Sequence, residues 1–161
     1  PSNRNFTGSQ VCGDCHTKAY EIWKETPHAW ATDSLIKPPE RQEIARHFDP
    51  ECLSCHVTGW NPQKYFPYQT GYWSLEKTLS MKGNGCENCH GPGSDHVAAE
   101  SGDLAVDDRQ RAVLRKQMQL TLEDARQNKC MECHDLDNSP DFHDPGAFEK
   151  YWKEVEHRGK D

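Results

Sequence analysis

Long apolar segments are missing from this sequence of 161 residues. No stretch approaches the roughly 18 apolar residues of a membrane-spanning helix, and no signal-peptide pattern is present. Leu, Ile, Val and Phe together number 23, and the mean hydropathy is −1.02. Such a composition is typical of disordered chains, because so little apolar burial does not offset the entropy lost on folding. An ordinary hydrophobic core is therefore excluded as the main source of stability.

Basic charge is also in short supply. The 26 acidic residues outnumber the 19 Lys and Arg residues, which gives a formal net charge of −7. An acidic surface argues against nucleic acid and favours a protein partner that docks through Lys or Arg. The length indicates a single domain over residues 1–161.

No cysteine lies outside four copies of one motif, Cys-x-x-Cys-His. In this pattern two thiols bind the vinyl groups of one porphyrin, and the histidine ligates the haem iron. The cysteines are Cys12, Cys15, Cys52, Cys55, Cys86, Cys89, Cys130 and Cys133, and the motif histidines are His16, His56, His90 and His134. The sequence thus predicts four covalently attached haems c. Their porphyrins would be the core, so we expect no stable fold without them.

Two other uses of eight cysteines compete with this interpretation. Cys-x-x-Cys pairs also build zinc sites of four thiolates, and secreted proteins use cysteines in disulfide frameworks. Neither use needs a histidine after the second cysteine of every pair, so haem attachment is favoured. The first cysteines lie 40, 34 and 44 residues apart, a spacing too irregular for a strict repeat.

The fold class that the pattern indicates is mainly α with extensive irregular coil, organised around the haems. We expect helices at 18–26, from Pro38 to His47, at 104–119, after a capping box at Thr121, and around an apolar stripe of 148–155. Residues 57–85 carry aromatic side chains without a period. They predict an irregular loop. Its aromatic rings either cover haem faces or serve as ordinary loop anchors.

Four irons each need a sixth ligand or an open position. The histidines outside the motifs are His28, His47, His96, His143 and His157, and the methionines are Met81, Met118 and Met131. Met131 lies inside the fourth motif and is badly placed to reach another haem. Two histidines per iron are therefore favoured at most sites, which predicts lower potentials than histidine–methionine ligation gives.

The chain resembles the cytochrome c-554 family of tetrahaem cytochromes. The resemblance rests on the first motif with Tyr20, Trp23 and residues 26–29, on the second motif through Gly59, and on the third motif through Gly93 and His96. Residues 138–140 and 148–157 also resemble members of the wider family. The resemblance implies a tetrahaem fold and electron transfer.

The resemblance also implies distal ligands. It places His28 opposite His90 and His96 opposite His16, and by the same logic His47 opposite His134. It implies an open iron at His56, although His157 is a second candidate to cap that iron. His143 is the weakest candidate.

Three functions stay open at this stage. The first is an electron carrier between redox protein partners. The second is an enzyme that reduces a small nitrogen oxide, nitric oxide, at an open iron on His56. The third is a self-associating or modular multihaem conduit. Haem c is attached outside the cytoplasmic membrane, so we expect an exported protein, periplasmic or extracellular, whose leader has been removed.

Overall fold

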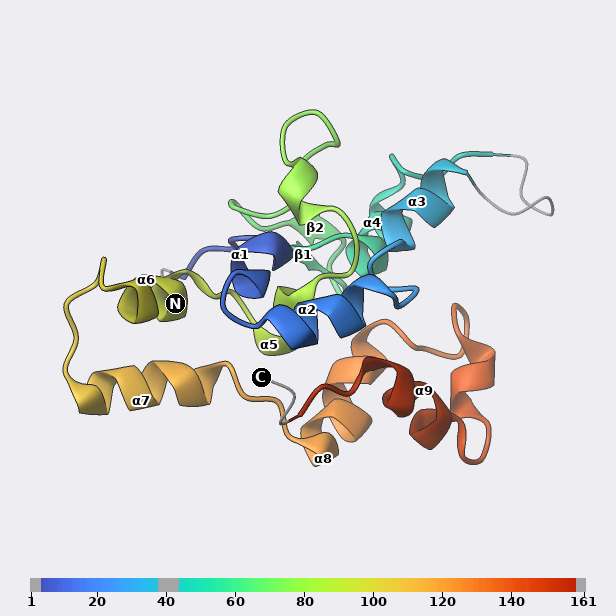
Figure 1. Cartoon of the computed structure of the whole chain (residues 1–161). Coiled ribbons are helices and arrows are strands. Elements are labelled where there is room, and N and C mark those ends of the chain that lie inside the picture. The colour runs from blue at the N-terminus through green and yellow to red at the C-terminus, as the bar shows by residue number, and fades with distance from the viewer. Residues whose placement is uncertain (1–3, 38–43, 159–161) are drawn as a thin grey trace.

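The structure is a computed structural model that describes residues 4–37 and 44–158. It is mainly helical with little strand, as the sequence predicts (Figure 1). The α-helices are α1 Ser9–Gly13, α2 Thr17–Lys24, α3 Ala31–Ile36, α4 Pro50–His56, α5 Cys86–His90, α6 Ser94–Ser101, α7 Asp108–Gln117, α8 Leu122–Asp124 and α9 Ala147–Val155. The strands are β1 Trp60–Asn61 and β2 Phe66–Pro67, and one-turn 3₁₀ segments cover Leu79–Met81, Cys130–Glu132 and Pro140–His143. A π-helical turn, Ala125–Lys129, joins α8 to the fourth motif.

Most helices begin and end where local chemistry predicts. α2 ends shortly before Pro27, and Tyr20 and Trp23 lie together on it with ring centroids 5.5 Å apart. Thr121 caps α8 by accepting a hydrogen bond from the Asp124 backbone N–H. The C-terminal prediction is also confirmed, because α9 buries Phe148 on one face.

Two helix predictions need correction. Residues 104–107 are not helical, because Asp107 and Gln110 form a capping box that starts α7 only at Asp108. The helix expected from Pro38 to His47 begins in residues outside the described ranges, and its described part, 44–47, is bend and turn.

The protein core is split into two small clusters. One cluster surrounds the second motif and contains Leu35, Leu53, Val57, Tyr72 and Met81. The other lies beside the fourth motif and contains Ala125, Phe142 and Phe148. Neither cluster has the size of an ordinary core for this length, which agrees with the low apolar content.

The segment 57–85 is irregular, as expected, apart from the antiparallel ribbon of β1 and β2. Gly59, at φ 79°, and Gly71 approach so closely that a Cβ on either would clash with the other backbone. Tyr72 is buried in the core, whereas Trp73 is exposed. Tyr72 thus anchors the loop in the core, and the placement of aromatic rings over haem faces stays a prediction.

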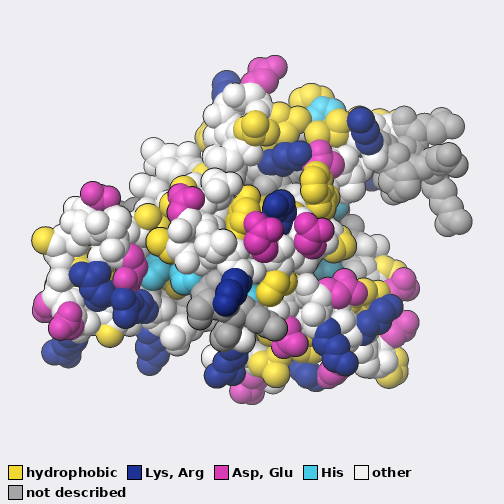
Figure 2. Space-filling view, in the orientation of Figure 1, with side chains coloured by type: hydrophobic (Ala, Val, Ile, Leu, Met, Phe, Trp, Pro, Cys, Tyr) yellow, Lys and Arg dark blue, Asp and Glu magenta, His cyan; other side chains and the backbone are white. Residues whose placement is uncertain are grey.

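Helices α6 and α7 pack on one another as an arm at one side of the molecule, and α8 and α9 lie together below α2 (Figure 1). On the face drawn in Figure 2, acidic and basic side chains are interspersed rather than gathered in one patch of either sign. Within the described residues, no helix combines the length and the apolar character needed to cross a membrane.

Candidate haem sites

Each Cys-x-x-Cys-His motif forms a single helical turn. The second motif is the last turn of α4, and the third motif is the whole of α5. In the first and fourth motifs the histidine N–H donates to the carbonyl of the first cysteine, at 2.8 Å for His16 and 2.9 Å for His134. A turn of this kind places both thiols and the imidazole on one side of the backbone, as attachment to one porphyrin requires. We refer to the four sites by the order of their motifs.

The thiols of different motifs are neighbours. A hydrogen bond from Cys12 lowers the pKa of the Cys86 thiol to about 7, and a hydrogen bond from Cys133 lowers the pKa of Cys55 to about 7. Burial, and next the charge of Cys130, raise the pKa of Cys89 to about 12. The sites thus form one continuous row in the order first, third, fourth, second.

A cavity of about 1200 Å³ opens along this row. Cofactor pockets are commonly about 300–1000 Å³, so the cavity has room for more than one small group. It is lined by thiols of the second, third and fourth motifs, by the imidazoles of His56 and His134, and by Trp60 and Tyr68 from the aromatic loop. The lining residues that could hold haem are Cys55, Cys89, Cys130, Cys133, His28, His56 and His134.

The two competing uses of cysteine find no support. All eight cysteines are unbridged thiols. Within residues 4–37 and 44–158, no three His, Cys, Asp or Glu side chains converge as a bare metal site. The donor set therefore fits a porphyrin better than zinc.

Three pairs of imidazole rings face one another at the separation that one metal between them requires. Two metal–nitrogen bonds of about 2 Å, with the ring radii added, place the centroids about 6 Å apart. The observed separations and interplanar angles are 6.3 Å and 19° for His16 and His96, 6.1 Å and 56° for His28 and His134, and 5.7 Å and 55° for His90 and His157. These centroid separations match those of two histidines that share one iron, at the first, third and fourth sites.

Only one of the three expected pairings agrees with this geometry. His96 lies opposite His16, as the resemblance implies. His28, however, lies beside His134 instead of His90, and His157 takes the place beside His90. His157 is therefore not brought to His56, where the sequence offered it as a cap.

His47 is not brought to His134. Its ring contacts Phe48, with centroids 4.0 Å apart, and lines a separate groove with Leu53 and Trp73. Its Nδ1 is buried without a hydrogen-bond partner in the described structure.

Among the described residues His56 makes no ring contact with another histidine. Its charge, after burial, lowers the pKa of His28, but the ring of His28 contacts that of His134. The Nδ1 of His56 contacts the Ala31 carbonyl at 2.8 Å and the Ser34 hydroxyl at 3.4 Å. The second site thus has a motif histidine, while His28, the histidine that interacts with it, has its ring contact with His134.

Hydrogen bonds orient the imidazoles of the motifs. His90 Nδ1 donates to the Met118 carbonyl at 2.7 Å, and His134 Nδ1 lies 2.9 Å from the Ser139 hydroxyl. Such contacts fix the ring and leave Nε2 for a metal. Burial lowers the pKa of His134 to about 4 and also lowers that of His90, which favours the neutral, ligating form. His143 differs, because its Nε2 is engaged by the His134 carbonyl at 2.8 Å.

The methionines have other roles. Met81 is buried in the core cluster beside the second motif, and Met131 packs against the cluster beside the fourth. Met118 contributes its carbonyl to His90. Histidine is therefore the better distal ligand at the first, third and fourth sites.

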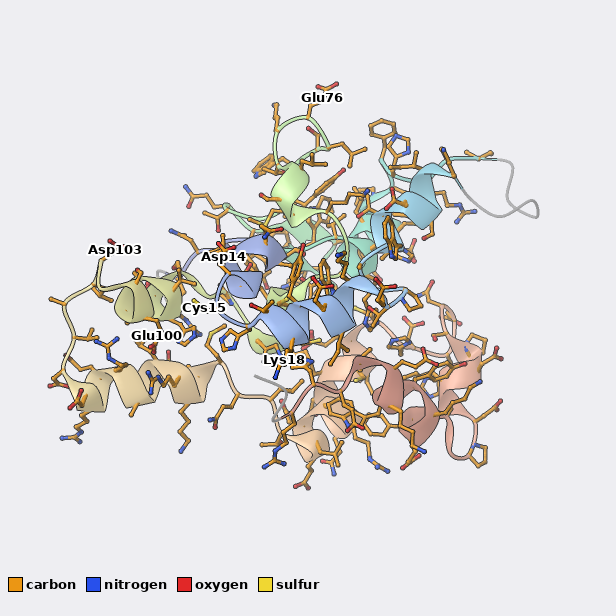
Figure 3. The ribbon with its side chains drawn as sticks, in the orientation of Figure 1. Asp14, Cys15, Lys18, Glu76, Glu100 and Asp103 are labelled. Atoms are coloured by element: carbon orange, nitrogen blue, oxygen red, sulfur yellow. The ribbon has the colours of Figure 1, made fainter. Side chains whose placement is uncertain are left out.

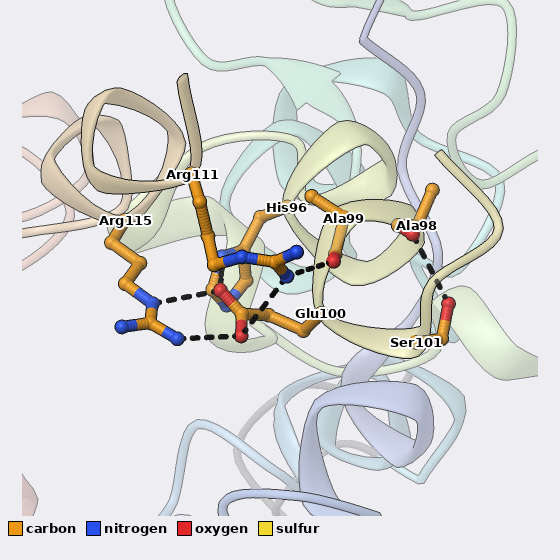
Figure 4. Close-up of polar contacts among 7 residues, drawn as sticks. All are labelled: His96, Ala98, Ala99, Glu100, Ser101, Arg111 and Arg115. Carbon is orange, nitrogen blue, oxygen red and sulfur yellow. Dashed lines mark hydrogen bonds and ion pairs between the residues drawn. The ribbon is translucent and has the colours of Figure 1, made fainter. Parts of the chain in front are cut away.

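The distal side of the first site is braced by an ion-pair cluster. Glu100 projects from α6 towards α7 (Figure 3), and its Oε1 lies 3.9 Å from His96 Nδ1. Arg115 donates to both Glu100 oxygens at 2.8 Å, and Arg111 binds the Ala99 carbonyl (Figure 4). The guanidinium of Arg115 holds the pKa of Glu100 at about 2. α7 is thereby fixed over the helix that carries His96.

Buried polar side chains that sequence reasoning missed lock the motifs together. Thr32 donates to the His56 carbonyl at 2.7 Å and accepts from Gly83 N–H at 2.8 Å. Thr58 links the chain after the second motif to Gly83 and Gly85, just before the third. A threonine has no sequence signal for this role, because its partners are distant backbone groups.

These features define a multihaem c-type cytochrome. The family described as cytochrome c554 and c-prime matches residues 11–91, and the chain belongs to this family. It therefore carries four haems c.

A protein of known sequence and a solved structure, both described as cytochrome c554 of Nitrosomonas europaea, are similar to the chain. Cytochrome c-554 of Nitrosomonas europaea is 32% identical over 144 residues, which cover 80% of this chain and 57% of that protein. The solved structure of reduced cytochrome c554 from Nitrosomonas europaea superposes with a TM-score of 0.54 at 25% identity, covering 83% of this chain and 66% of that one. The chain thus spans less than two thirds of the length of either relative. The fourth motif lies beyond the residues that the family matches.

Proposed function

We propose that this chain transfers single electrons between redox proteins through four haems c. Haem c supplies reversible one-electron chemistry at its iron when bound. The observation that carries the proposal is the continuous row of attachment sites, in which each motif has a cysteine beside a cysteine of the next. Such a row lets the first and second sites, at its two ends, serve two different partners.

In this proposal the residues divide into three groups. The eight motif cysteines form the thioethers, and the four motif histidines are the proximal ligands. His96, His28 and His157 are the distal ligands of the first, fourth and third sites, in agreement with their ring separations. The whole of 1–161 acts as one tetrahaem unit, because the row of sites connects both halves of the chain.

The environment follows from the same chemistry. Haem c attachment requires export, so the chain works in the periplasm or outside the cell. The net charge of −7 favours partners that dock through Lys or Arg. Their association should slow as salt is added, because screening weakens long-range attraction.

Intact mass and electron counting test this function. Under denaturing conditions the mass should exceed the chain mass of 18.5 kDa by four haems, each about 0.6 kDa, because thioether-bound haem survives unfolding. A potentiometric titration should take up four electrons per chain. The matched control replaces Cys130 and Cys133 with serine, which should remove one haem and one electron. A wild-type mass equal to that of the bare chain would contradict the proposal.

One observation favours a second function at the second site. His56 lines the cavity, and the ring of His28, which lines it too, contacts His134 instead of His56. A small gas such as nitric oxide therefore has a place to bind, and reduction of nitric oxide there is the alternative function. Titration of the reduced protein with carbon monoxide should then bind one equivalent per chain. No binding would exclude this alternative and leave the carrier function intact.

A further inference from the structure

Glu87 is a buried carboxylate inside the third motif. Only 2% of its surface is exposed. Its two oxygens accept hydrogen bonds from the backbone N–H groups of Thr7 at 3.0 Å, Gly8 at 2.8 Å and Gly93 at 2.8 Å, and from the Thr7 hydroxyl at 3.2 Å. In each of these contacts the partner is a donor and the carboxylate accepts. An ionised carboxylate, which can only accept hydrogen bonds, suits such surroundings.

No Lys, Arg or His of the described residues forms an ion pair with this carboxylate. None of the ion pairs within residues 4–37 and 44–158 includes Glu87. A buried charge without a counter-ion is costly even when it is hydrogen-bonded. A glutamine here would turn its amide N–H groups against one of these N–H donors, so the surroundings are built for a carboxylate and not for a neutral side chain.

The charge lies between the first and third sites. Glu87 follows Cys86 directly, and its partners Thr7 and Gly8 come just before α1, which carries Cys12. The pKa of Cys12 is raised by its hydrogen bond with Cys86, by burial, by the charge of Cys86 and by the charge of Glu87. The pKa of Cys86 is lowered mainly by the hydrogen bond with Cys12, and Glu87 opposes that lowering. The field of the carboxylate thus reaches attachment points of both sites.

We propose that Glu87 holds down the reduction potentials of the first and third haems, and leaves those of the second and fourth much less affected. This inference rests on the proposed function. Oxidation adds one positive charge at the iron, and a nearby anion in a dry environment stabilises that charge. Burial without a counter-ion leaves the field of Glu87 largely unscreened. Glu87 acts through its charge alone and binds no iron.

Glu132 offers a matched control within the fourth motif. It also lies between the two cysteines of a motif, and its charge raises the pKa of Cys133, after the larger effects of Cys55 and burial. Its Oε1, however, pairs with Lys129 Nζ at 2.7 Å, and its side chain is 36% exposed. Solvent and the ammonium therefore screen it.

The test is a potentiometric titration of holoprotein followed by EPR. Glu87→Gln should raise two of the four midpoint potentials, one of which belongs to the first site. That site is recognisable because its nearly parallel axial rings give a spectrum different from that of crossed rings. Glu132→Gln should shift no midpoint by a comparable amount. Glu87→Asp, which keeps the charge, should restore both potentials towards their wild-type values.

Several outcomes would overturn the inference. They are unchanged potentials in Glu87→Gln with lowered stability alone, equal shifts of all four potentials, or equal effects of the two glutamine variants. If Glu87→Gln does not assemble, Thr7→Lys keeps the carboxylate and places an ammonium beside it, and must raise the same two potentials. Four haems by mass and four electrons in wild type would uphold the carrier function in each case.

Discussion

The distal ligand of the third site gives the sharpest test of the structure. Replacing His157 with alanine should raise the number of high-spin haems from one to two per chain. One is the haem of the second site, because the ring of His28 contacts His134 instead of His56. The new one is the haem of the third site, where His90 loses the ring 5.7 Å away. EPR and the near-infrared or visible charge-transfer bands of the oxidised protein count both.

The same change should lower thermal stability by a limited amount. An iron between His90 and His157 ties the C-terminal tail to the body of the protein. By the loop-closure relation for cross-links, fixing the tail from His134 to His157 contributes about 3 kcal/mol. The buried ring of Phe148 already docks α9, so we expect a loss of about 1–3 kcal/mol and a fall in Tm of about 2–10 °C.

The matched control is His47→Ala. The structure keeps His47 beside Phe48 and away from His134, so the high-spin count should stay at one. The family-based pairing requires the reverse, because it assigns His47 to the fourth site. A second high-spin haem in His47→Ala, with none added in His157→Ala, would refute the ring pairs described above.

Three further outcomes follow from the same structure. The oxidised protein should show two kinds of low-spin EPR spectrum in a ratio of one to two, because the axial rings are nearly parallel at the first site and crossed at the third and fourth; a single kind would contradict these angles. Phe142→Ala should cost about 3–5 kcal/mol in denaturant unfolding, because Phe142 is 6% exposed and stacks 4.1 Å from His134, whereas Phe48→Ala, at an 80% exposed position, should change stability by less than about 0.5 kcal/mol. Chain produced without haem should show no cooperative thermal transition by circular dichroism, since its two clusters are too small to fold it, and a sharp transition would contradict that reasoning.

Local features of the fold were predictable because their causes lie within a few residues. The motif turns, the stop at Pro27, the cap at Thr121 and the amphipathic α9 each depend on neighbours along the chain. The start of α7 at Asp108 also has a local cause, since Asp107 and Gln110 form a recognisable capping box. The expectation that the helix starts earlier gave too much weight to helix propensity and too little to the cap.

The buried polar residues were not predictable in the same way. Glu87 and Thr58 appear in the sequence as an ordinary acidic residue in a motif and an ordinary threonine after one. Their significance comes from partners about 80 and 27 residues away, at Thr7 and Gly85. These side chains stabilise the fold only because the motifs pack against one another and bring the distant backbone partners within hydrogen-bond distance.

The pairing of the distal histidines shows why proximity of the backbone does not determine a ligand. The carbonyl of His28 accepts a hydrogen bond from Asn84 N–H at 2.9 Å, two residues before the third motif. Trp23 reinforces this junction by donating to the Asn84 carbonyl at 2.9 Å. The backbone of His28 is thus held beside the third motif, where the resemblance assigned its ring. The imidazole nevertheless lies 6.1 Å from His134 of the fourth motif, because the third and fourth sites are neighbours in the row. A histidine at such a junction can serve either site, and its side-chain direction, which no sequence pattern encodes, decides between them.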